Sequence, residues 1–414
     1  MAIAWWRERA YAKRFVADLL AGELARTRRS AAGLPPAPWA EDLTLASLGV
    51  DSLERVELAT ALAEAIHLHR AGVEDTLLAR ASLAGWIDVA REGLDAWSEE
   101  MTFHTSGSAG EPKACTHAAA ALAQEAEELA RLFAGSRRIV AAVPCHHIYG
   151  FLFTVLLPQA LGLPAQAVID AGRRSVPSLG PLLQPGDLVV GHPDFWRLAA
   201  RTLRQVAQGV AGVTSTAPCP DEVSEDVARA GFGSFVHVYG SSETAGVGWR
   251  ASHRDPYCLF PFWTRAPDDP ASLVRTLPGG AHLAARVQDE IEWLDERRFR
   301  VGSRRDRAVQ VGGINVYPQR VRETLLRLPG VREAAVRPMA PHEGARLKAF
   351  IVPEDHVLDL TAFEARVREW IDGELTAPER PRALSFGPAL PRSAAGKLAD
   401  WPLEPGGAPA ALAS

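Results

Sequence analysis

Residues that could bind phosphate groups gather in one short segment. Residues 105–113 read Thr-Ser-Gly-Ser-Ala-Gly-Glu-Pro-Lys. Small residues allow backbone N–H groups to approach phosphate oxygens, and the hydroxyls of Thr105, Ser106 and Ser108 add further donors. The Lys113 ammonium can neutralise phosphate charge, although the segment lacks the Gly-Lys-Ser/Thr ending of a Walker loop. We interpret the segment as a nucleotide-binding loop, with an ordinary serine–glycine loop as the alternative.

The lysines are few enough for their positions to be informative. The chain has 45 lysine and arginine residues, but lysine occurs only at positions 13, 113, 348 and 397. Lys113 and Lys397 each end a glycine-containing string, where a compact ammonium on a flexible stem suits phosphate chemistry. Lys13 and Lys348 lack such a context, and we expect both on the surface of the protein.

An aromatic ring and a carboxylate follow an apolar run later in the chain. The run at 235–239 predicts a strand, and residues 239–243, Tyr-Gly-Ser-Ser-Glu, lie at its carboxyl end. Ligands of α/β sheets bind at this end of the strands. Tyr239 can stack on a purine, and Glu243 can hold Mg²⁺, which prefers oxygen ligands beside phosphates.

The composition disfavours several classes of function. A formal net charge of −5 and the absence of a strongly basic run argue against nucleic-acid binding. No apolar run is long enough to span a bilayer, and the N-terminus lacks the pattern of a secretory signal. The four cysteines are widely spaced without a CxxC pair, which disfavours a disulfide framework or a zinc site. We therefore expect a cytoplasmic protein without membrane insertion.

Hydrophobic periodicity divides the chain into three parts. Residues 10–95 have the apolar spacing of helices. Between 101 and 304, short apolar runs alternate with helical stretches, which is typical of an α/β layered domain. The strands expected there include 139–143, 188–190 and 235–239. A smaller α+β unit follows, with strands expected at 309–311, 334–336 and 349–352 and helices at 318–328 and 360–374.

Five strings, taken in chain order, resemble the motifs of the adenylate-forming superfamily of acyl-CoA synthetases, peptide-synthetase adenylation domains and luciferases. They are the strings at 105–113, 239–243, 287–289, 303–306 and 391–397, and the resemblance spans residues 102–402. It implies an enzyme that uses ATP and Mg²⁺. In this family a carboxylate attacks the α-phosphate of ATP, which gives an acyl-adenylate and pyrophosphate, and a thiol then displaces AMP.

The resemblance also implies roles for single residues. The nucleotide-binding residues would be Thr105, Ser106, Gly107, Ser108, Gly110, Lys113, Thr216, Ala217, Pro218, Tyr239, Gly240, Ser241, Ser242, Asp289 and Arg304. Tyr239 corresponds to the aromatic residue that stacks on adenine, and Asp289 and Arg304 to the contacts with the ribose. Glu243 corresponds to the Mg²⁺ ligand. Asp306 corresponds to the hinge of a mobile lid, and Lys397 to the catalytic lysine that stabilises charge at the α-phosphate.

Residues 144–150, Pro-Cys-His-His-Ile-Tyr-Gly, resemble the family's segment beside the carboxylate of the acid substrate. The resemblance assigns His147, Tyr149 and Gly150, together with Tyr239, to the substrate pocket, with His147 in a catalytic role as gate or wall. A hydrogen-bonded packing histidine is the alternative. A metal site at His146 and His147 is disfavoured because no further ligands cluster nearby in the sequence.

Ser52 lies in a string with a second resemblance. Residues 49–58, Gly-Val-Asp-Ser-Leu-Glu-Arg-Val-Glu-Leu, resemble the phosphopantetheine attachment site of acyl carrier proteins. Attachment at Ser52 would require a phosphopantetheinyl transferase as a partner. A plain helix cap is the alternative, because Asp51 and Ser52 lie where a helix is expected to begin.

These patterns together predict a multidomain chain. We expect an all-α four-helix carrier-like domain at 1–97, a truncated α/β adenylation core at 98–304, a small α+β C-terminal lid at 305–402 and a disordered tail at 403–414. The organisation resembles that of compact aryl-acid–carrier ligases of bacterial aryl polyene pigment pathways, such as the hydroxybenzoate ligase for xanthomonadin.

Three functions agree with these patterns. The first is a ligase that adenylates a small aromatic acid, with hydroxybenzoate as the expected substrate, and transfers it to the phosphopantetheine thiol of an acyl carrier protein in cis or in trans. The second uses free coenzyme A and has a structural N-terminal domain. The third is a catalytically degenerate docking protein of a synthase complex, because Ala109, Gln288 and Ser303 depart from the family's motifs.

Overall fold

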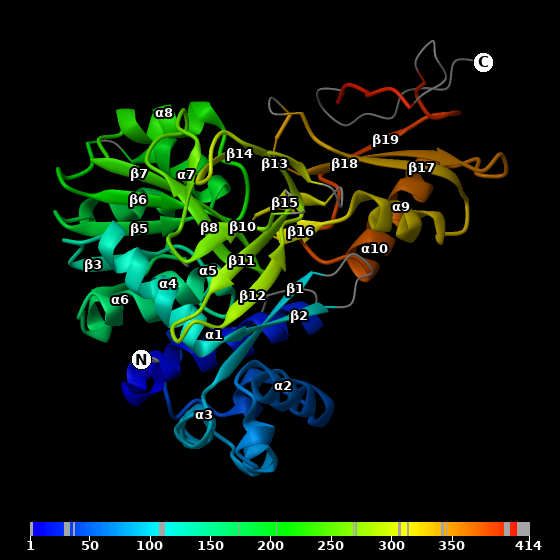
Figure 1. Cartoon of the computed structure of the whole chain (residues 1–414). Helices are drawn as coiled ribbons and strands as arrows, with labels where there is room; N and C mark the ends of the chain where they lie inside the picture. Colours follow the sequence, from blue (N-terminus) through cyan, green and yellow to red (C-terminus); the bar gives the residue numbers. More distant parts are fainter. Residues whose placement is uncertain are drawn as a thin grey trace. The chain divides into compact units, whose positions relative to one another are not determined.

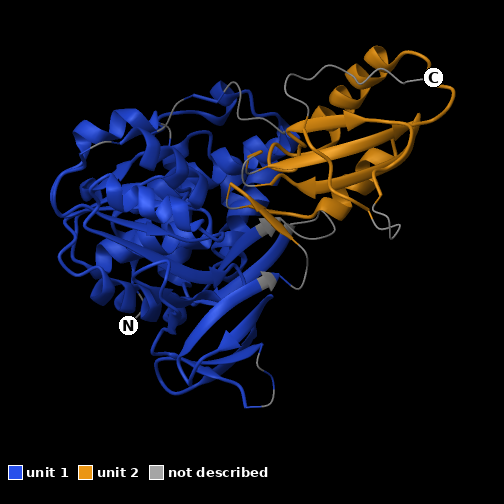
Figure 2. Ribbon diagram, turned by 90° about the horizontal axis from the view of Figure 1, so that it is seen from above, with its two compact units in different colours: residues 1–105, 112–306 blue, residues 106–111, 307–414 orange. Residues whose placement is uncertain are grey.

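The chain divides into two compact units, which are coloured separately in Figure 2. In this computed structural model, the described residues are 3–28, 34–35, 38–106, 112–172, 174–203, 205–267, 269, 271–304, 308–312, 314–340, 343–344, 346–392 and 398–403. The first unit comprises residues 1–105 and 112–306, and the second comprises 307–414 with 106–111. The division therefore lies next to Asp306, the position of the expected hinge.

A nine-stranded mixed sheet organises the first unit (Figure 1). Its strand order is β13-β14-β9-β8-β7-β6-β5-β3-β4. The strands are β3 (Arg138–Ala141), β4 (Val168–Asp170), β5 (Asp187–Gly191), β6 (Ala211–Thr214), β7 (Ser234–Ser241), β8 (Ala245–Arg250), β9 (Tyr257–Leu259), β13 (Asp289–Trp293) and β14 (Arg298–Arg304). The pairs among β3 to β7 are parallel, and those from β7 through β8, β9 and β14 to β13 are antiparallel.

Alternating side chains of the parallel strands pack on both faces of this sheet. Leu188 and Val190 of β5 belong to one hydrophobic core, and Val189 belongs to another. Helix α4 (Ala119–Leu132) packs on the first side, and α7 (Pro193–Thr202) and α8 (Asp221–Arg229) pack on the second (Figure 1). A parallel sheet covered on both faces has strands that are apolar throughout. The predicted α/β core is therefore confirmed, and strands overlap all three of its expected apolar runs.

The N-terminal helices share the core of this sheet instead of having one of their own. They are η1 (Trp5–Arg7), α1 (Arg9–Thr27), η2 (Leu45–Leu48), α2 (Ser52–Ala65), η3 (Leu68–Arg70), η4 (Glu74–Ala79) and α3 (Leu83–Ala96). The ring of Phe15 in α1 lies 5.6 Å from that of Phe151, and Trp5 lies 5.3 Å from the same Phe151 ring. Such aromatic contacts dominate core energetics through the apolar area that they bury. A separate four-helix carrier-like domain is therefore not confirmed.

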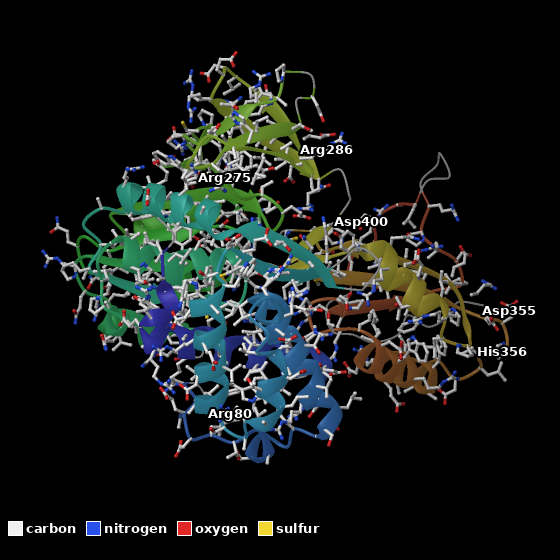
Figure 3. The ribbon with its side chains drawn as sticks, turned by 60° about the horizontal axis from the view of Figure 1, so that its bottom comes forward. Arg80, Arg275, Arg286, Asp355, His356 and Asp400 are labelled. Carbon is white, nitrogen blue, oxygen red and sulfur yellow. The ribbon has the colours of Figure 1, made fainter. Side chains whose placement is uncertain are left out.

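Two smaller sheets complete the first unit. One is the two-stranded sheet of β1 (Glu100–Ser106) and β2 (Pro112–Ala118). The other is antiparallel and contains β10 (Trp263–Arg265), β11 (Ser272–Thr276) and β12 (His282–Arg286). Arg275 of β11, labelled in Figure 3, is buried against α4, where its guanidinium lies 3.4 Å from Glu125. Glu125 also accepts a 2.8 Å hydrogen bond from the backbone N–H of Gly246 in β8. This buried pair ties the small sheet to the large one.

The second unit has the α+β pattern that the sequence predicts. Its elements are β15 (Val309–Val311), β16 (Ile314–Val316), α9 (Pro318–Leu326), β17 (Val331–Pro338), β18 (Leu347–Pro353), α10 (Leu360–Glu374) and β19 (Ala383–Phe386). The order of its three-stranded sheet is β17-β18-β19, with β18 in the centre. Residues 404–414, most of the tail expected to be disordered, lie outside the described residues.

The expected surface position of Lys348 is wrong. Its side chain on the central strand β18 is 0% exposed, and its ammonium donates to Glu343 at 2.8 Å and to the carbonyl of Trp401 at 2.7 Å. Asp400 lies 3.1 Å from the same ammonium. A charge is tolerated in a protein interior when it is paired and hydrogen-bonded, and two of these partners, Asp400 and Trp401, come from a distant part of the sequence.

In the part of the chain that the structure describes, no helix is both long and apolar enough to cross a membrane.

Candidate active site

The expected phosphate-binding segment begins on strand β1 and ends on strand β2. The backbones of Thr105 and Ser106 end β1, and Lys113 lies near the start of β2. Gly107, Ser108 and Gly110 lie outside the described residues, and the same holds for Asp306 and Lys397. The contacts of Lys113 therefore define this part of the site.

Lys113 forms an ion pair with Glu243, which lies 130 residues later in the sequence. The Lys113 ammonium donates to Glu243 Oε1 at 2.7 Å. Desolvation opposes ionisation of Glu243, but the hydrogen bond from Lys113 and other donors hold its pKa below the usual range. Glu243 is thus an ionised carboxylate beside a cation, the arrangement in which a carboxylate keeps its charge.

His117 also makes a contact in this region, although none of the sequence motifs includes it. It follows Lys113 by four residues on the same strand β2, and its Nε2–H donates to the carbonyl of Ser242 at 2.7 Å. Burial lowers the pKa of His117, so the ring is the neutral donor. β2 therefore contacts two residues of the turn that follows β7, through Lys113 at Glu243 and through His117 at Ser242.

Tyr239 and Gly240 lie near the end of strand β7, as the apolar run predicted. The Tyr239 hydroxyl donates to Asp289 Oδ2 at 2.8 Å. Burial, and then the charge of Asp289, raise the pKa of Tyr239. A Cβ at Gly240 would lie 2.2 Å from the carbonyl oxygen of Ala245, so the close approach of β8 requires glycine here.

Asp289 and Arg304, which the resemblance assigns to the ribose, face each other across two strands. Their Cα atoms are register partners in the antiparallel pair β13–β14. Directly opposed residues in such a pair have neighbouring side chains. Tyr239, Asp289 and Arg304 therefore form one group in the first unit, although their motifs are well separated in the sequence.

The segment after β6 contains a strained backbone. Thr216 has a φ of +79°, a value that a β-branched residue rarely adopts. Its buried hydroxyl has no hydrogen-bond partner within the described structure. Strain of this kind costs of order 1–3 kcal/mol and clusters at functional sites. The assignment of Thr216, Ala217 and Pro218 to a ligand-binding segment stays a prediction.

Residues 144–150, the histidine segment, lead into a helix that contains a π-helical stretch. The consecutive elements are α5 (Ile148–Phe151), the π-helical η5 (Leu152–Leu156) and α6 (Leu157–Ala160). A Cβ at Gly150 would lie 1.8 Å from the carbonyl oxygen of Pro144, so the segment folds back on its own helix. His147 lies just before α5 and is exposed. Desolvation by the surrounding protein and, after it, the neighbouring His146 lower the pKa of His147. Its ring is therefore neutral at neutral pH.

Tyr149 does not lie on an open pocket wall. Its side chain is buried, and its hydroxyl lies 3.1 Å from the carbonyl of Gly191 and 3.2 Å from that of Val213. These carbonyls belong to the region where β5 and β6 end. The structure places Tyr149 in the core as a link between strand ends, because burial of a phenol requires a partner for its O–H.

Ser52 is the exposed first residue of α2, and Asp51 is the cap. The Asp51 carboxylate accepts from the backbone N–H of Glu54 at 2.8 Å, and Glu54 reaches back to the N–H of Asp51, which makes a capping box. Arg28, just after α1, donates to Glu54 at 2.6 Å and to the carbonyl of Leu48 at 3.1 Å. The expected helix start is confirmed, and α1 fixes the loop before it.

The donor set around Glu243 fits a magnesium ion bound with phosphates. Mg²⁺ is commonly held by one or two carboxylates together with phosphate oxygens and waters, without an all-protein cage. Glu243 supplies one ionised carboxylate. Among the described residues no group of three or more His, Cys, Asp and Glu side chains could hold a metal by itself.

The comparisons with known proteins decide the family. Residues 46–272 match the AMP-binding enzyme family, and residues 321–397 match the AMP-binding enzyme C-terminal domain. The chain belongs to the AMP-binding enzyme family. A relative named 4-coumarate–CoA ligase, from Cereibacter sphaeroides, is 38% identical to this AMP-binding enzyme over 86% of the chain and 84% of the relative. Another of that name, from Halorhodospira halophila, is 37% identical over 93% of the chain and 97% of the relative.

Solved structures show the same fold at low sequence identity. The amide bond synthetase McbA from Marinactinospora thermotolerans matches with a TM-score of 0.61 and 17% identity, over 96% of this chain and 98% of that one. An o-succinylbenzoate CoA synthetase from Bacillus subtilis matches with a TM-score of 0.58 and 18% identity, over 79% of this chain and 72% of that one.

The extent of the family match bears on the N-terminal helices. The match begins at residue 46, before Ser52, and therefore includes all of α2 and α3. Together with the shared hydrophobic core, this makes both helices part of the AMP-binding enzyme fold. A carrier domain that replaces part of this fold finds no support here.

Proposed function

We propose that this AMP-binding enzyme joins a small planar aromatic acid to coenzyme A, with ATP converted to AMP and pyrophosphate. The enzyme is an acid–thiol ligase of the AMP-forming type. The observation that most supports a working nucleotide site is the assembly of Lys113 with Glu243, and of Tyr239 with Asp289. The aromatic acid is supported by relatives named 4-coumarate–CoA ligase.

The proposed reaction has two displacements. A carboxylate oxygen of the acid attacks the α-phosphorus of ATP, the bond to the bridging oxygen breaks, and pyrophosphate leaves with the electron pair. The sulfur of coenzyme A then attacks the carbonyl carbon of the acyl-adenylate, and AMP leaves with the electron pair of the C–O bond. The proton of the thiol passes to solvent. Positioning and charge stabilisation account for most catalysis of this type.

Each residue of the nucleotide group has a proposed task. Lys113 binds phosphate oxygens, Asp289 and Arg304 hold the ribose hydroxyls, and the ring of Tyr239 stacks on adenine. The Tyr239 hydroxyl also keeps Asp289 in place, since it donates to that carboxylate. Mg²⁺ bound at Glu243 would neutralise phosphate charge. Lys397 is proposed to stabilise charge at the α-phosphate.

Free coenzyme A is the favoured acceptor. The relatives that match almost the whole chain are named as CoA ligases, and the region around Ser52 packs into the catalytic fold. The thiol of coenzyme A ends the same phosphopantetheine group that a carrier protein presents. The chemistry of the second step is therefore the same for either acceptor, and only the recognition differs.

Loading of a carrier is the second candidate, and the surface around Ser52 is the observation behind it. Ser52 is exposed, and its neighbours Leu53 and Val56 are 70% and 48% exposed. An acyl carrier protein could be supplied in trans, or Ser52 could itself carry phosphopantetheine. The intact mass of the chain after co-expression with a phosphopantetheinyl transferase shows whether Ser52 carries phosphopantetheine. The Ser52→Ala variant is the control for this measurement.

Acid-dependent exchange of labelled pyrophosphate into ATP tests the first step. We expect exchange with 4-coumarate or 4-hydroxybenzoate, little with acetate or malonate, and none in Lys397→Ala. Chromatography then measures the acyl-CoA that wild type and Ser52→Ala each form with free coenzyme A. Equal amounts of product from the two proteins favour free coenzyme A as the acceptor. Absence of exchange with every acid would support the degenerate docking protein instead.

A further inference from the structure

We propose that Asp18, on the N-terminal helix α1, is a positioning residue that holds the His146–His147 segment in place for binding of the acid. This inference rests on the proposed function, because the role of His147 at the acid carboxylate belongs to it. It extends the function to a helix that lies before the family match, which begins at residue 46. The contacts that support it all lie within the first compact unit.

One carboxylate oxygen of Asp18 accepts three hydrogen bonds from the histidine segment. Oδ2 lies 2.6 Å from the backbone N of Cys145, 3.1 Å from the backbone N of His146 and 2.8 Å from His146 Nδ1. Hydrogen bonds to an ionised acceptor are shorter and about twice as strong as neutral ones. These bonds span 127 and 128 residues of sequence, so they fix the segment against a distant helix and not against its own neighbours.

The charge state of Asp18 agrees with this geometry. Desolvation opposes ionisation, but the charge of His146 and the hydrogen bonds from it keep the pKa of Asp18 well below its usual range. Asp18 is therefore ionised at neutral pH. An ionised carboxylate oxygen only accepts hydrogen bonds, so it is Nδ1–H of His146 that donates to Oδ2.

Two further residues of α1 face the same segment. Arg14, Asp18 and Gly22 are spaced by four and therefore lie on one face of the helix. The backbone carbonyl of Arg14 lies 3.5 Å from Cys145 Sγ. At Gly22, a Cβ would lie 2.6 Å from Cε1 and Nε2 of His146, so the imidazole rests directly on the helix backbone.

His147 is held between this anchor and a second one. The rings of His146 and His147 have centroids 4.2 Å apart. On the other side, Tyr149 is fixed by its hydroxyl to the strand ends at Gly191 and Val213. His147 is the exposed residue between the two fixed points. Without the Asp18 anchor, the backbone of His147 is held from the Tyr149 side only. This matters because a displacement of about 1 Å at a reacting site can lower the rate roughly 100-fold.

The experiment compares Asp18→Ala, Asp18→Asn and Asp88→Ala in the full chain. Asp88 is the matched control because it also pairs with α1, through Arg9, but lies on an exposed surface. Pyrophosphate exchange gives KM for the acid and KM for ATP separately. Hydrogen exchange of residues 144–150, followed by mass spectrometry, reports on the segment without any need for activity.

We expect Asp18→Ala to raise KM for the acid by about 10-fold or more while KM for ATP stays within about 2-fold. Asp18→Asn, which keeps an acceptor oxygen but loses the charge, should lie between Asp18→Ala and wild type. Hydrogen exchange at 144–150 should rise in Asp18→Ala and stay unchanged in Asp88→Ala. A merely structural role would lower the melting temperature without this separation of the two KM values.

Several outcomes overturn the proposal. Unchanged hydrogen exchange at 144–150 in Asp18→Ala refutes the anchor. Faster exchange with an unchanged KM for the acid, or with equal rises in both KM values, refutes positioning for the acid. Wild type without any acid-dependent activity refutes the proposed function, and with it the role at the acid, while hydrogen exchange still decides whether Asp18 holds the segment.

Discussion

The ammonium of Lys113 donates to the carboxylate of Glu243 at 2.7 Å, and this contact joins two motifs that lie 130 residues apart. The side chains of Lys113 and Glu243 are 53% and 28% exposed. A pair this open to solvent contributes about 1 kcal/mol or less to folding. The contact between Lys113 on β2 and Glu243 is therefore better explained by ligand binding than by stability.

The first prediction separates these two explanations. Lys113→Met and Glu243→Gln should each lower acid-dependent pyrophosphate exchange by roughly 100-fold, because charge stabilisation at phosphate is lost. Their melting temperatures should stay close to that of wild type. Arg254→Ala is a control, since it removes the exposed ion pair with Glu225. Loss of stability in step with loss of exchange would argue for a structural pair.

The second prediction concerns the hydroxyl of Tyr239. Tyr239→Phe keeps the ring but removes the donor to Asp289. A hydrogen bond to a charged group is worth about 1.5–3 kcal/mol, so KM for ATP should rise by roughly 10-fold or more. Tyr239→Ala also removes the ring and should have a larger effect. Equal KM values for wild type and Tyr239→Phe would leave no role for the hydroxyl in holding Asp289.

The third prediction is a pH dependence of stability from Glu125. Burial raises the pKa of Glu125 to about 7 from its ordinary value of 4.5, although Arg275 opposes the shift. The folded protein therefore binds more protons than the unfolded chain between these values. This contribution to stability is full below the unfolded pKa and is lost as pH rises through about 7.

Glu125→Gln removes this titrating group and tests the third prediction. Urea denaturation from about pH 4.5 to 8 should show the stability of wild type falling relative to that of the variant as pH rises. The amide oxygen of the variant side chain would still offer an acceptor to the backbone N–H of Gly246. A difference in unfolding free energy that is constant over the whole range would contradict the raised pKa.

The fourth prediction concerns the second unit. Lys348→Met should lower the melting temperature of this unit, because the carboxylate of Glu343 loses the ammonium with which it pairs. Calorimetry of the full chain measures the effect. Lys13→Met is the matched control, as it removes another lysine from a helix of the first unit. A melting curve equal to that of wild type would show that the ammonium adds nothing.

Local patterns in the sequence were sufficient for the elements and the motifs. The apolar run at 188–190 predicted a strand, and Asp51 and Ser52 predicted the start of a helix, because both signals depend on neighbours within a few residues. The order of the nucleotide motifs led to the AMP-binding enzyme family, which the matches at 46–272 and 321–397 confirm.

Only the tertiary structure decided what these elements pack against. Hydrophobic periodicity correctly predicted helices in residues 10–95, but it could not show that Phe15 and Trp5 share a core with Phe151. This shared core argues against a separate carrier-like domain. The buried Lys348 and the anchor at Asp18 were hidden for the same reason. Trp401 lies 53 residues from Lys348, and His146 lies 128 residues from Asp18. Such contacts arise from the packing of whole elements, which no local pattern of residues encodes.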